Sequence, residues 1–146
     1  PTPIWYEDLD ADGFGNPVVS ITNCIQPIGY ISDNSDCDDT QLLYADIDND
    51  TFGAGAPVAC GVSSSNDCND NNNAINPAAT EVCNGIDDDC ANGIDDGLTF
   101  LNYYVDADGD GFGAGLATSS CNPIVGSVLV DGDCDDNNAA VNPSAI

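Results

Sequence analysis

The chain has 146 residues, of which 26 are acidic and none is lysine, arginine or histidine, so its formal charge at pH 7 is −26. It therefore lacks the side chains that neutralise nucleic-acid phosphates and the histidine or lysine that most nucleophilic enzymes require. No apolar run is long enough to span a bilayer. We expect no nucleic-acid partner, no membrane insertion and no enzyme activity.

The acidic residues have no cationic partner within the chain, so folding brings like charges together. Two carboxylates 4 Å apart repel by up to about 4 kcal/mol at the effective dielectric of a protein surface. Leu, Ile, Val and Phe make up only about a fifth of the residues, close to the composition of disordered proteins. We therefore expect cations from outside the chain to make folding possible.

Three acidic loops share an aromatic lead-in, three alternating acids and a Phe-Gly pair. Acids at positions 1, 3 and 5 with glycine at position 6 reproduce the first half of the EF-hand loop, in which the carbonyl of position 7 is a further ligand. This spacing lets the carboxylates converge on one ion when the chain curls around it. The expected ligands are Asp8, Asp10, Asp12 and Phe14; Asp46, Asp48, Asp50 and Phe52; and Asp106, Asp108, Asp110 and Phe112.

The loops differ from an EF-hand in two respects. Position 12, where a bidentate glutamate belongs, falls on Val19, Pro57 and Ala117, so the remaining oxygen ligands must come from elsewhere. The second loop has Thr51 at position 6. We expect this loop to be the most strained, because glycine is the residue that permits the sharp turn there.

An Asp-Cys motif follows each loop: SDCDDT at 35–40, NDCNDNNN at 66–73 and GDCDDNN at 132–138. We assign each motif to the loop before it, as the source of the missing oxygens. The second and third motifs also keep the alternate spacing and are candidates to begin a second site. The expected ligands are Asp36, Asp38 and Asp39; Asp67, Asn69, Asp70, Asn71 and Glu81; and Asp133, Asp135, Asp136 and Asn137.

An acidic connector, TEVCNGIDDDCANGIDDG, separates the second and third loop–motif pairs and has its own two cysteines. We predict a further cation site there, with the ligands Asp87, Asp89, Asp95 and Asp96. The expected organisation is repeat 1 (1–41), repeat 2 (42–79), the connector (80–97) and repeat 3 (98–146). Because NPSAI at 142–146 resembles NPAAT at 76–80, we expect the chain to be one module of a longer array.

The secondary structure is predicted to be sparse. Glycine and proline interrupt the chain throughout, and no apolar period of 3.6 residues persists for three turns. Short segments rich in β-branched and aromatic residues predict strands instead, at Ile4–Tyr6, Val18–Cys24, Gln41–Tyr44, Phe100–Val105 and Ser127–Val130. The expected fold is mainly β with little regular secondary structure, built from tandem calcium-binding loop repeats and short β-hairpins cross-linked by disulfides.

The eight cysteines indicate disulfides and an extracellular setting. Eight cysteines allow 105 pairings, and the repeats favour local pairs in which each repeat closes its own loop. The expected bridges are Cys24–Cys37, Cys60–Cys68, Cys83–Cys90 and Cys121–Cys134. A thiolate metal cluster is the less favoured alternative, because no CxxC pair occurs and neighbouring carboxylates raise thiol pKa values.

The donor chemistry predicts the metal. Oxygen donors are abundant while histidine and methionine are absent, which favours Ca²⁺ over copper, zinc or iron. Flexible loops with many oxygens also favour Ca²⁺ over the stricter octahedral Mg²⁺, and ligand counting gives about four to eight ions.

Several segments carry a family resemblance. YYVDADGDGFG, GDCDDNNAAVNP and above all NPAATEVCNGIDDDCANGIDDG resemble the MopE-type metal-binding repeats of large secreted bacterial proteins, over nearly the whole chain. The loops are also similar to thrombospondin type 3 repeats. The resemblance implies an extracellular, multi-repeat, surface-associated protein. The chain departs from it at Ala91, where an acid is usual, and in lacking ligands for the copper that gives the family its name.

We therefore expect a calcium-stabilised extracellular structural or adhesive module. One version of this expectation is that the module is a subunit of a surface fibre or filament. The start, Pro1–Tyr6, is predicted to be an extended segment that adds to a neighbour's sheet edge, giving head-to-tail self-association. The alternative function is a Ca²⁺-dependent module that binds a glycan or another ligand. A third candidate is a calcium buffer or mineral-nucleating surface.

Overall fold

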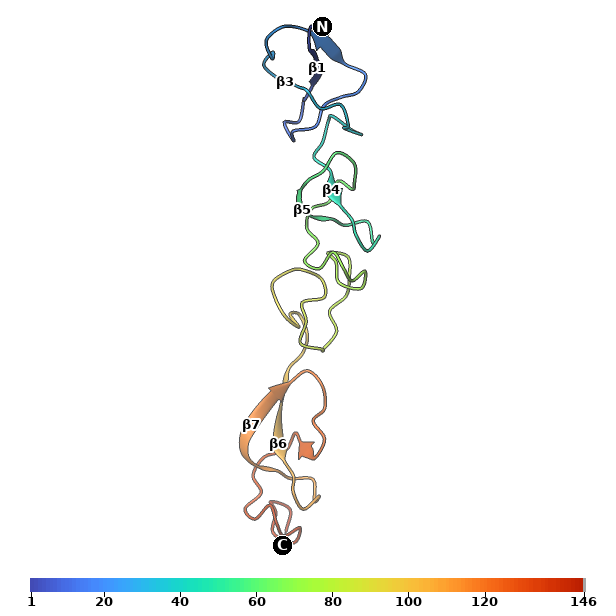
Figure 1. The fold of residues 1–146 in the computed structure, drawn as a ribbon. Helices are drawn as coiled ribbons and strands as arrows, with labels where there is room; N and C mark the ends of the chain where they lie inside the picture. The colour runs from blue at the N-terminus through green and yellow to red at the C-terminus, as the bar shows by residue number, and fades with distance from the viewer. Residues whose placement is uncertain (146) are drawn as a thin grey trace. The chain divides into compact units, whose positions relative to one another are not determined.

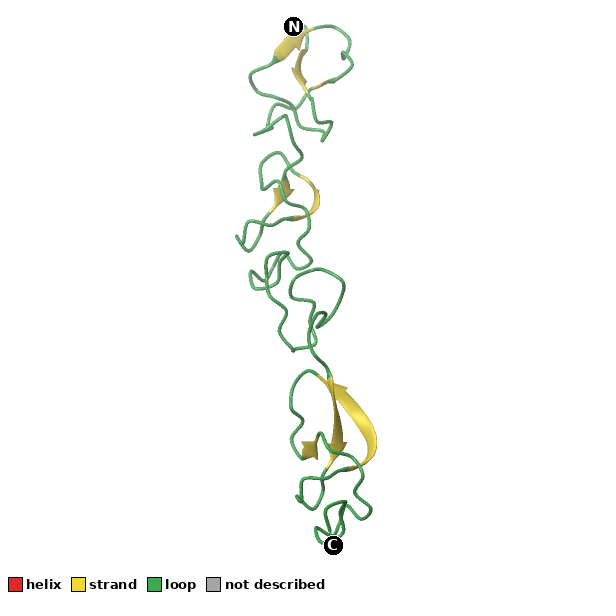
Figure 2. Cartoon of the chain, turned by 180° about the vertical axis from the view of Figure 1, so that it is seen from behind, coloured by secondary structure: helices red, strands yellow, loops and turns green. Residues whose placement is uncertain are grey.

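The computed structural model of the chain describes residues 1–145 (Figure 1). Within that range no residue is helical, and the strands form small antiparallel sheets joined by long loops (Figure 2). The predicted mainly β fold with little regular secondary structure is confirmed. The last residue of the predicted third repeat, Ile146, lies outside the described residues. No helix of the described part could cross a membrane.

The chain forms two compact units. The first comprises residues 1–80 and 87–94, and the second comprises residues 81–86 and those from 95 onward. The connector is thus divided, its DDDC segment belonging to the first unit and its EVCNG segment to the second.

The first sheet has the order β2-β1-β3, with β1 at Ile4–Glu7, β2 at Ser20–Thr22 and β3 at Tyr30–Ile31. Trp5 lies opposite Ile21 on one edge of β1, and Tyr6 lies opposite Ile31 on the other. Within β1, Tyr6 thus has a partner on both edges, whereas Ile4 and Trp5 pair only with β2. The addition of Pro1–Tyr6 to a neighbour's sheet stays a prediction.

The other two sheets repeat the hairpin. In the second, β4 (Tyr44–Ala45) pairs with β5 (Ala54–Pro57). In the third, β6 (Leu101–Val105) lies between β7 (Ala114–Ser120) and β8 (Ser127–Val128). Each acidic loop is therefore the connection between two paired strands, and the strand pairing fixes both of its ends.

The predicted strands overlap β1, β2, β4, β6 and β8, but β3, β5 and β7 were not predicted. The longest strand, β7, has the sequence AGLATSS, whose small residues have little intrinsic strand preference. It is a strand because β6 lies beside it. The predicted second strand is shortened to Ser20–Thr22, and β4 begins only at Tyr44.

The apolar core is very small. Among the described residues, the buried apolar side chains are those of Leu43, Ile75 and Tyr103. The buried charged side chains outnumber them: Asp36, Asp39, Asp67, Asp70, Asp88 and Asp95. Hydrophobic burial therefore contributes little here, and the energetics depend on what compensates these carboxylates.

A buried glycine ends each loop and packs against the tyrosine that precedes it. A Cβ added at Gly113 would lie 2.7 Å from the Cβ of Tyr104, and one added at Gly53 would lie 3.0 Å from the Cβ of Tyr44. Gly15 is the equivalent residue of the first loop. This close approach explains why each acidic run ends in glycine.

The disulfides differ from those expected. The structure pairs Cys37 with Cys60, Cys68 with Cys90 and Cys83 with Cys121, with Cα–Cα distances of 5.2, 5.5 and 5.8 Å, and it leaves Cys24 and Cys134 free and exposed. The expected local bridges Cys24–Cys37, Cys60–Cys68, Cys83–Cys90 and Cys121–Cys134 are therefore wrong.

The backbone explains the first of these corrections. The amide of Cys37 donates a 2.8 Å hydrogen bond to the carbonyl of Ala59, which places Cys37 beside Cys60 of the following hairpin. The neighbouring residue Asp36 is meanwhile bonded to its own loop through the carbonyl of Gly15. In the first Asp-Cys motif, Asp36 is thus bonded to the loop before the motif, and Cys37 is bonded to the segment after it.

Candidate metal centres

The three acidic loops share one backbone conformation. At position 6 the φ angles are +95° for Gly13, +82° for Thr51 and +92° for Gly111, all in the left-handed region. Position 4 is also left-handed in every loop. Threonine is disfavoured in that region because its branched side chain crowds the backbone, so the expected strain of the second loop is confirmed.

Backbone amides inside each loop hold at least two of its three carboxylates, and in the third loop they hold all three. The position 5 carboxylate accepts the amide of the phenylalanine at position 7, at 2.8 Å for Asp12 and Asp50 and 2.9 Å for Asp110. In the second and third loops, Asp46 and Asp106 accept the amides of positions 4 and 6, at 2.7 and 3.1 Å in both cases. The loop is therefore curled around its acids.

Each Asp-Cys motif docks on the loop before it through two sets of hydrogen bonds. Its last aspartate accepts the amide of position 2, in the pairs Leu9 to Asp39 at 2.8 Å, Ile47 to Asp70 at 2.9 Å and Ala107 to Asp136 at 2.9 Å. Its first aspartate donates its own amide to the carbonyl of the loop's final glycine, as in Asp67 to Gly53 at 3.2 Å. We call each such loop with its docked motif a loop–motif centre.

The carboxylates of the first and second centres converge. One oxygen from each of Asp10, Asp12 and Asp36 lies within 4.8 Å of the others, and the same holds for Asp8, Asp10 and Asp39. Asp46, Asp48 and Asp50 form such a group in the second centre. Oxygens bound to one Ca²⁺ at 2.3 to 2.6 Å are at most about 5 Å apart, so these groups have the dimensions of a calcium site.

Many of these oxygens are buried and have no hydrogen-bond donor, which is the observation that tests whether a cation fits. They are Oδ1 of Asp8 and Oδ2 of Asp10, Asp12 and Asp36 in the first centre; both oxygens of Asp48 and Oδ2 of Asp50 and Asp67 in the second; and Oδ2 of Asp108 and Asp133 in the third. Because a carboxylate oxygen withdrawn from water needs a compensating charge or donor, these donor sets fit a hard divalent cation.

In each loop the acid at position 3 has a raised pKa. Burial raises the pKa of Asp10, Asp48 and Asp108, and the carboxylates of the same loop and of its Asp-Cys motif raise these pKa values further. The motif carboxylates responsible include Asp36 in the first centre and Asp67 in the second. The like-charge repulsion expected from the composition is therefore concentrated where loop and motif meet.

Some expected ligands have other partners. Asp38 accepts hydrogen bonds from the side chains of Thr40 at 2.6 Å and Gln41 at 2.5 Å, and these bonds lower the pKa of Asp38. The second aspartate of the first Asp-Cys motif is thus bound by the last residue of that motif and by the residue that follows it. The ligand roles of the phenylalanine carbonyls and of Asn69, Asn71, Asp135 and Asn137 stay predictions.

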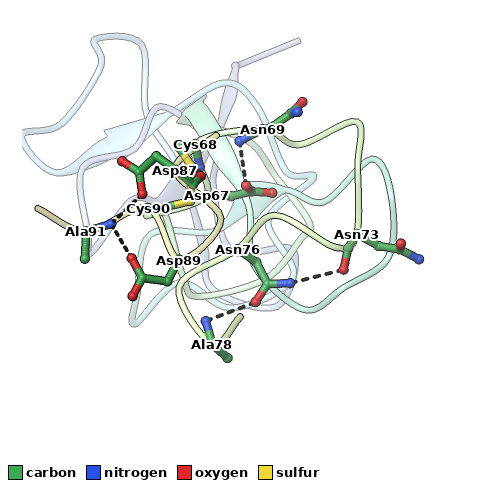
Figure 3. Close-up of a disulfide and its surroundings, with 10 residues drawn as sticks. All are labelled: Asp67, Cys68, Asn69, Asn73, Asn76, Ala78, Asp87, Asp89, Cys90 and Ala91. Atoms are coloured by element: carbon green, nitrogen blue, oxygen red, sulfur yellow. Dashed lines mark hydrogen bonds between the residues drawn. A yellow bond between two sulfur atoms is a disulfide. The ribbon is translucent and has the colours of Figure 1, made fainter. Parts of the chain in front are cut away.

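The connector acids form local hydrogen bonds in both units. In the first unit, the amide of Ala91 donates to Asp87 at 3.2 Å and to Asp89 at 3.0 Å (Figure 3). In the second unit, Asp95 accepts the amides of Asn84 at 2.9 Å and Gly85 at 3.1 Å, while Oδ1 of Asp96 is buried without a donor. Glu81 also belongs to the second unit.

Sequence reasoning missed two residues near the carboxylates. Asp88, between the two predicted ligands of the connector, is more buried than either neighbour, and its carbonyl accepts the amide of Asn76. Asn142 donates its side-chain amide to Oδ2 of Asp110 at 2.7 Å. The sequence signal for Asn142 was the Asn-Pro pair that begins there, because the same pair begins at Asn76.

Exchanging the residues at position 6 should change stability in opposite directions. A left-handed conformation costs a residue other than glycine about 1 to 2 kcal/mol. Thr51→Gly is expected to raise the free energy of unfolding by up to about 1 kcal/mol, because added backbone entropy in the unfolded chain offsets part of the gain. Gly111→Thr is expected to lower it by about 1 to 2 kcal/mol. Denaturant unfolding at fixed Ca²⁺ measures both, and changes of the same sign would contradict the shared loop geometry.

The comparisons with known proteins identify the sequence around two of the Asp-Cys motifs. The family model Cu-binding_MopE, described as a "Putative metal-binding motif", matches residues 67–96 and 133–146. The first match covers the second Asp-Cys motif and most of the connector, and the second begins at the third motif. Together they cover less than a third of the chain. No curated protein and no solved structure matches it. The chain thus carries the MopE-type metal-binding motif in these two segments, as the resemblance implied.

Proposed function

We propose that the chain is a calcium-stabilised structural module of an extracellular protein, with bound ions in place of the cations that its sequence lacks. The metal-binding motif and the three disulfides already fit a metal-binding extracellular module. The single observation that carries the proposal further is the set of buried carboxylate oxygens without donors in all three loop–motif centres.

The donor chemistry supports Ca²⁺ as the ion. The convergent groups of the first two centres present carboxylate oxygen, and the chain contains no histidine or methionine. Copper prefers nitrogen and sulfur ligands, whereas calcium prefers several oxygens in a flexible arrangement. The cysteines that lie close to a carboxylate, Cys68 and Cys90 beside Asp67 and Cys83 and Cys121 beside Asp95, are joined in disulfides, so they offer no thiolate to a softer metal.

The position of the ions supports a structural role without catalysis. A cation held by Asp10 and Asp36, or by Asp48 and Asp67, joins a loop to a segment about 20 to 25 residues further along the chain. Such ions close the fold in the way that a hydrophobic core closes most domains, and their binding free energy adds directly to the stability of the folded form. The module then serves an extracellular protein as a structural or adhesive element.

Removing one convergent aspartate should weaken the third centre. Asp133 has a buried oxygen without a donor, whereas the nearby Asp131 is exposed and accepts only a local hydrogen bond, from Gly132 at 2.7 Å. Asp133→Ala is expected to lower the Ca²⁺ affinity of one site at least about ten-fold. Asp131→Ala, which removes the same charge, should leave that site nearly unchanged. Isothermal titration measures both, and equal losses would show that only total charge matters.

Different metals should stabilise the protein to different degrees. Because a ligand that binds only the folded form raises the unfolding temperature in proportion to its binding free energy, Ca²⁺ is expected to raise it more than Mg²⁺ or Cu²⁺ at equal free concentration. Thermal unfolding of metal-free protein titrated with each ion, with disulfides kept intact, measures the order. A larger shift with Cu²⁺ would overturn the assignment of calcium.

A further inference from the structure

The disulfides follow a fixed order along the chain. Each Asp-Cys motif contains one cysteine, here called the motif cysteine, and one cysteine follows the second strand of each hairpin, here called the hairpin cysteine. The first motif cysteine, Cys37, is bonded to the next hairpin cysteine, Cys60. The connector continues the order, because Cys90 bonds the second motif cysteine and Cys83 bonds the third hairpin cysteine. The Cys37–Cys60 and Cys68–Cys90 bonds therefore run from a loop–motif centre to the segment that follows it, and the Cys83–Cys121 bond runs from the connector to the third hairpin.

This order leaves one cysteine of each kind without a partner. Cys24 is the first hairpin cysteine and Cys134 is the third motif cysteine, and both are exposed. The other six described cysteines are in disulfides. The two free thiols are thus complementary halves of the bond that the chain makes internally, and no second free thiol of either kind remains.

Cys24 has the backbone setting of a bonded hairpin cysteine. It lies two residues after the end of β2, and Cys121 lies directly after the end of β7. In both turns the side chain before the cysteine accepts the amide of the residue after it, Asn23 from Ile25 at 3.4 Å and Ser120 from Asn122 at 3.1 Å. Cys121 forms a disulfide in this setting, with the connector's Cys83, and the second hairpin cysteine, Cys60, forms one with a motif cysteine.

Cys134 likewise has the setting of the two bonded motif cysteines. The aspartate before it accepts the amide of the residue after it at 2.9 Å, and the equivalent distances are 2.9 Å around Cys37 and 2.7 Å around Cys68. This turn presents the cysteine at its tip beside the carboxylate that faces the loop, as Figure 3 shows for Asp67 next to the Cys68–Cys90 bond. Cys37 and Cys68 are both bonded from this conformation.

We propose that Cys134 of one chain forms a disulfide with Cys24 of a second copy, repeating between chains the bond that Cys37 and Cys60 make within one chain. The partner is a second copy because each chain offers one thiol of each kind, so that successive copies join head to tail. Two thiols lose two protons and two electrons in forming the bond, and a small disulfide such as oxidised glutathione takes them up and becomes two thiols. The inference rests on the oxidising, extracellular setting of the proposed function, but not on the identity of the metal.

Two single-cysteine variants test the proposal. The full chain with Ca²⁺ is oxidised by a mixture of reduced and oxidised glutathione and separated on a non-reducing gel. The unsubstituted chain should give a ladder of oligomers that collapses to monomer with reductant. Cys24→Ser alone and Cys134→Ser alone should each stay monomeric, whereas their mixture should give one dimer and nothing larger. Peptide mapping of that dimer by mass spectrometry should show Cys24 joined to Cys134 and the three internal disulfides unchanged.

A matched control tests whether position matters. In the Cys24→Ser, Cys134→Ser chain, Ser144→Cys moves the thiol to another exposed site ten residues away. Mixed with the Cys134→Ser chain, it should give little dimer. Equal dimer from this control, Cys24–Cys24 dimers of the Cys134→Ser chain, or a monomer closed by its own Cys24–Cys134 bond would each overturn the proposal. Calcium titration of the same samples separates this failure from a failure of the proposed function.

Discussion

The structure depends on compensating carboxylates that the chain itself cannot compensate. Six aspartates are buried among the described residues against three apolar side chains, and the sequence contains no cationic side chain. Backbone amides satisfy one oxygen of Asp36, Asp67 and Asp133, the first aspartates of the three Asp-Cys motifs, and the other oxygen of each is buried without a donor. In this protein the electrostatic balance takes the place that apolar burial has in most domains.

With the proposed function, ions and disulfides stabilise different parts of the molecule. A cation at a loop–motif centre closes the centre internally, joining an acidic loop to its own Asp-Cys motif. Disulfides connect the first and second centres to the segments that follow them, through the Cys37–Cys60 and Cys68–Cys90 bonds. Because the first aspartate and the cysteine of a motif are adjacent in sequence, one short turn serves both linkages, and ordering the carboxylate also orders the sulfur.

The acidic loops and the docking of each Asp-Cys motif could be predicted because the information is local. Alternating acids with glycine at position 6 fix a turn, and Thr51 identified the strained copy. The disulfides could not be predicted in the same way, since the rule that each repeat closes on itself ignored the backbone bond from Cys37 to Ala59. The strand β7 and the position of Asp38 were missed because each depends on a partner, β6 in one case and the side chains of Thr40 and Gln41 in the other.

The most direct test of this account is to remove divalent ions at neutral pH with a chelator while the disulfides stay intact, and to follow the hydrodynamic radius and the circular dichroism. The account predicts that the chain expands and loses its β signal, and that added Ca²⁺ restores both. An unchanged radius and spectrum, in a sample that elemental analysis finds free of metal, would contradict the claim that external cations hold this fold together.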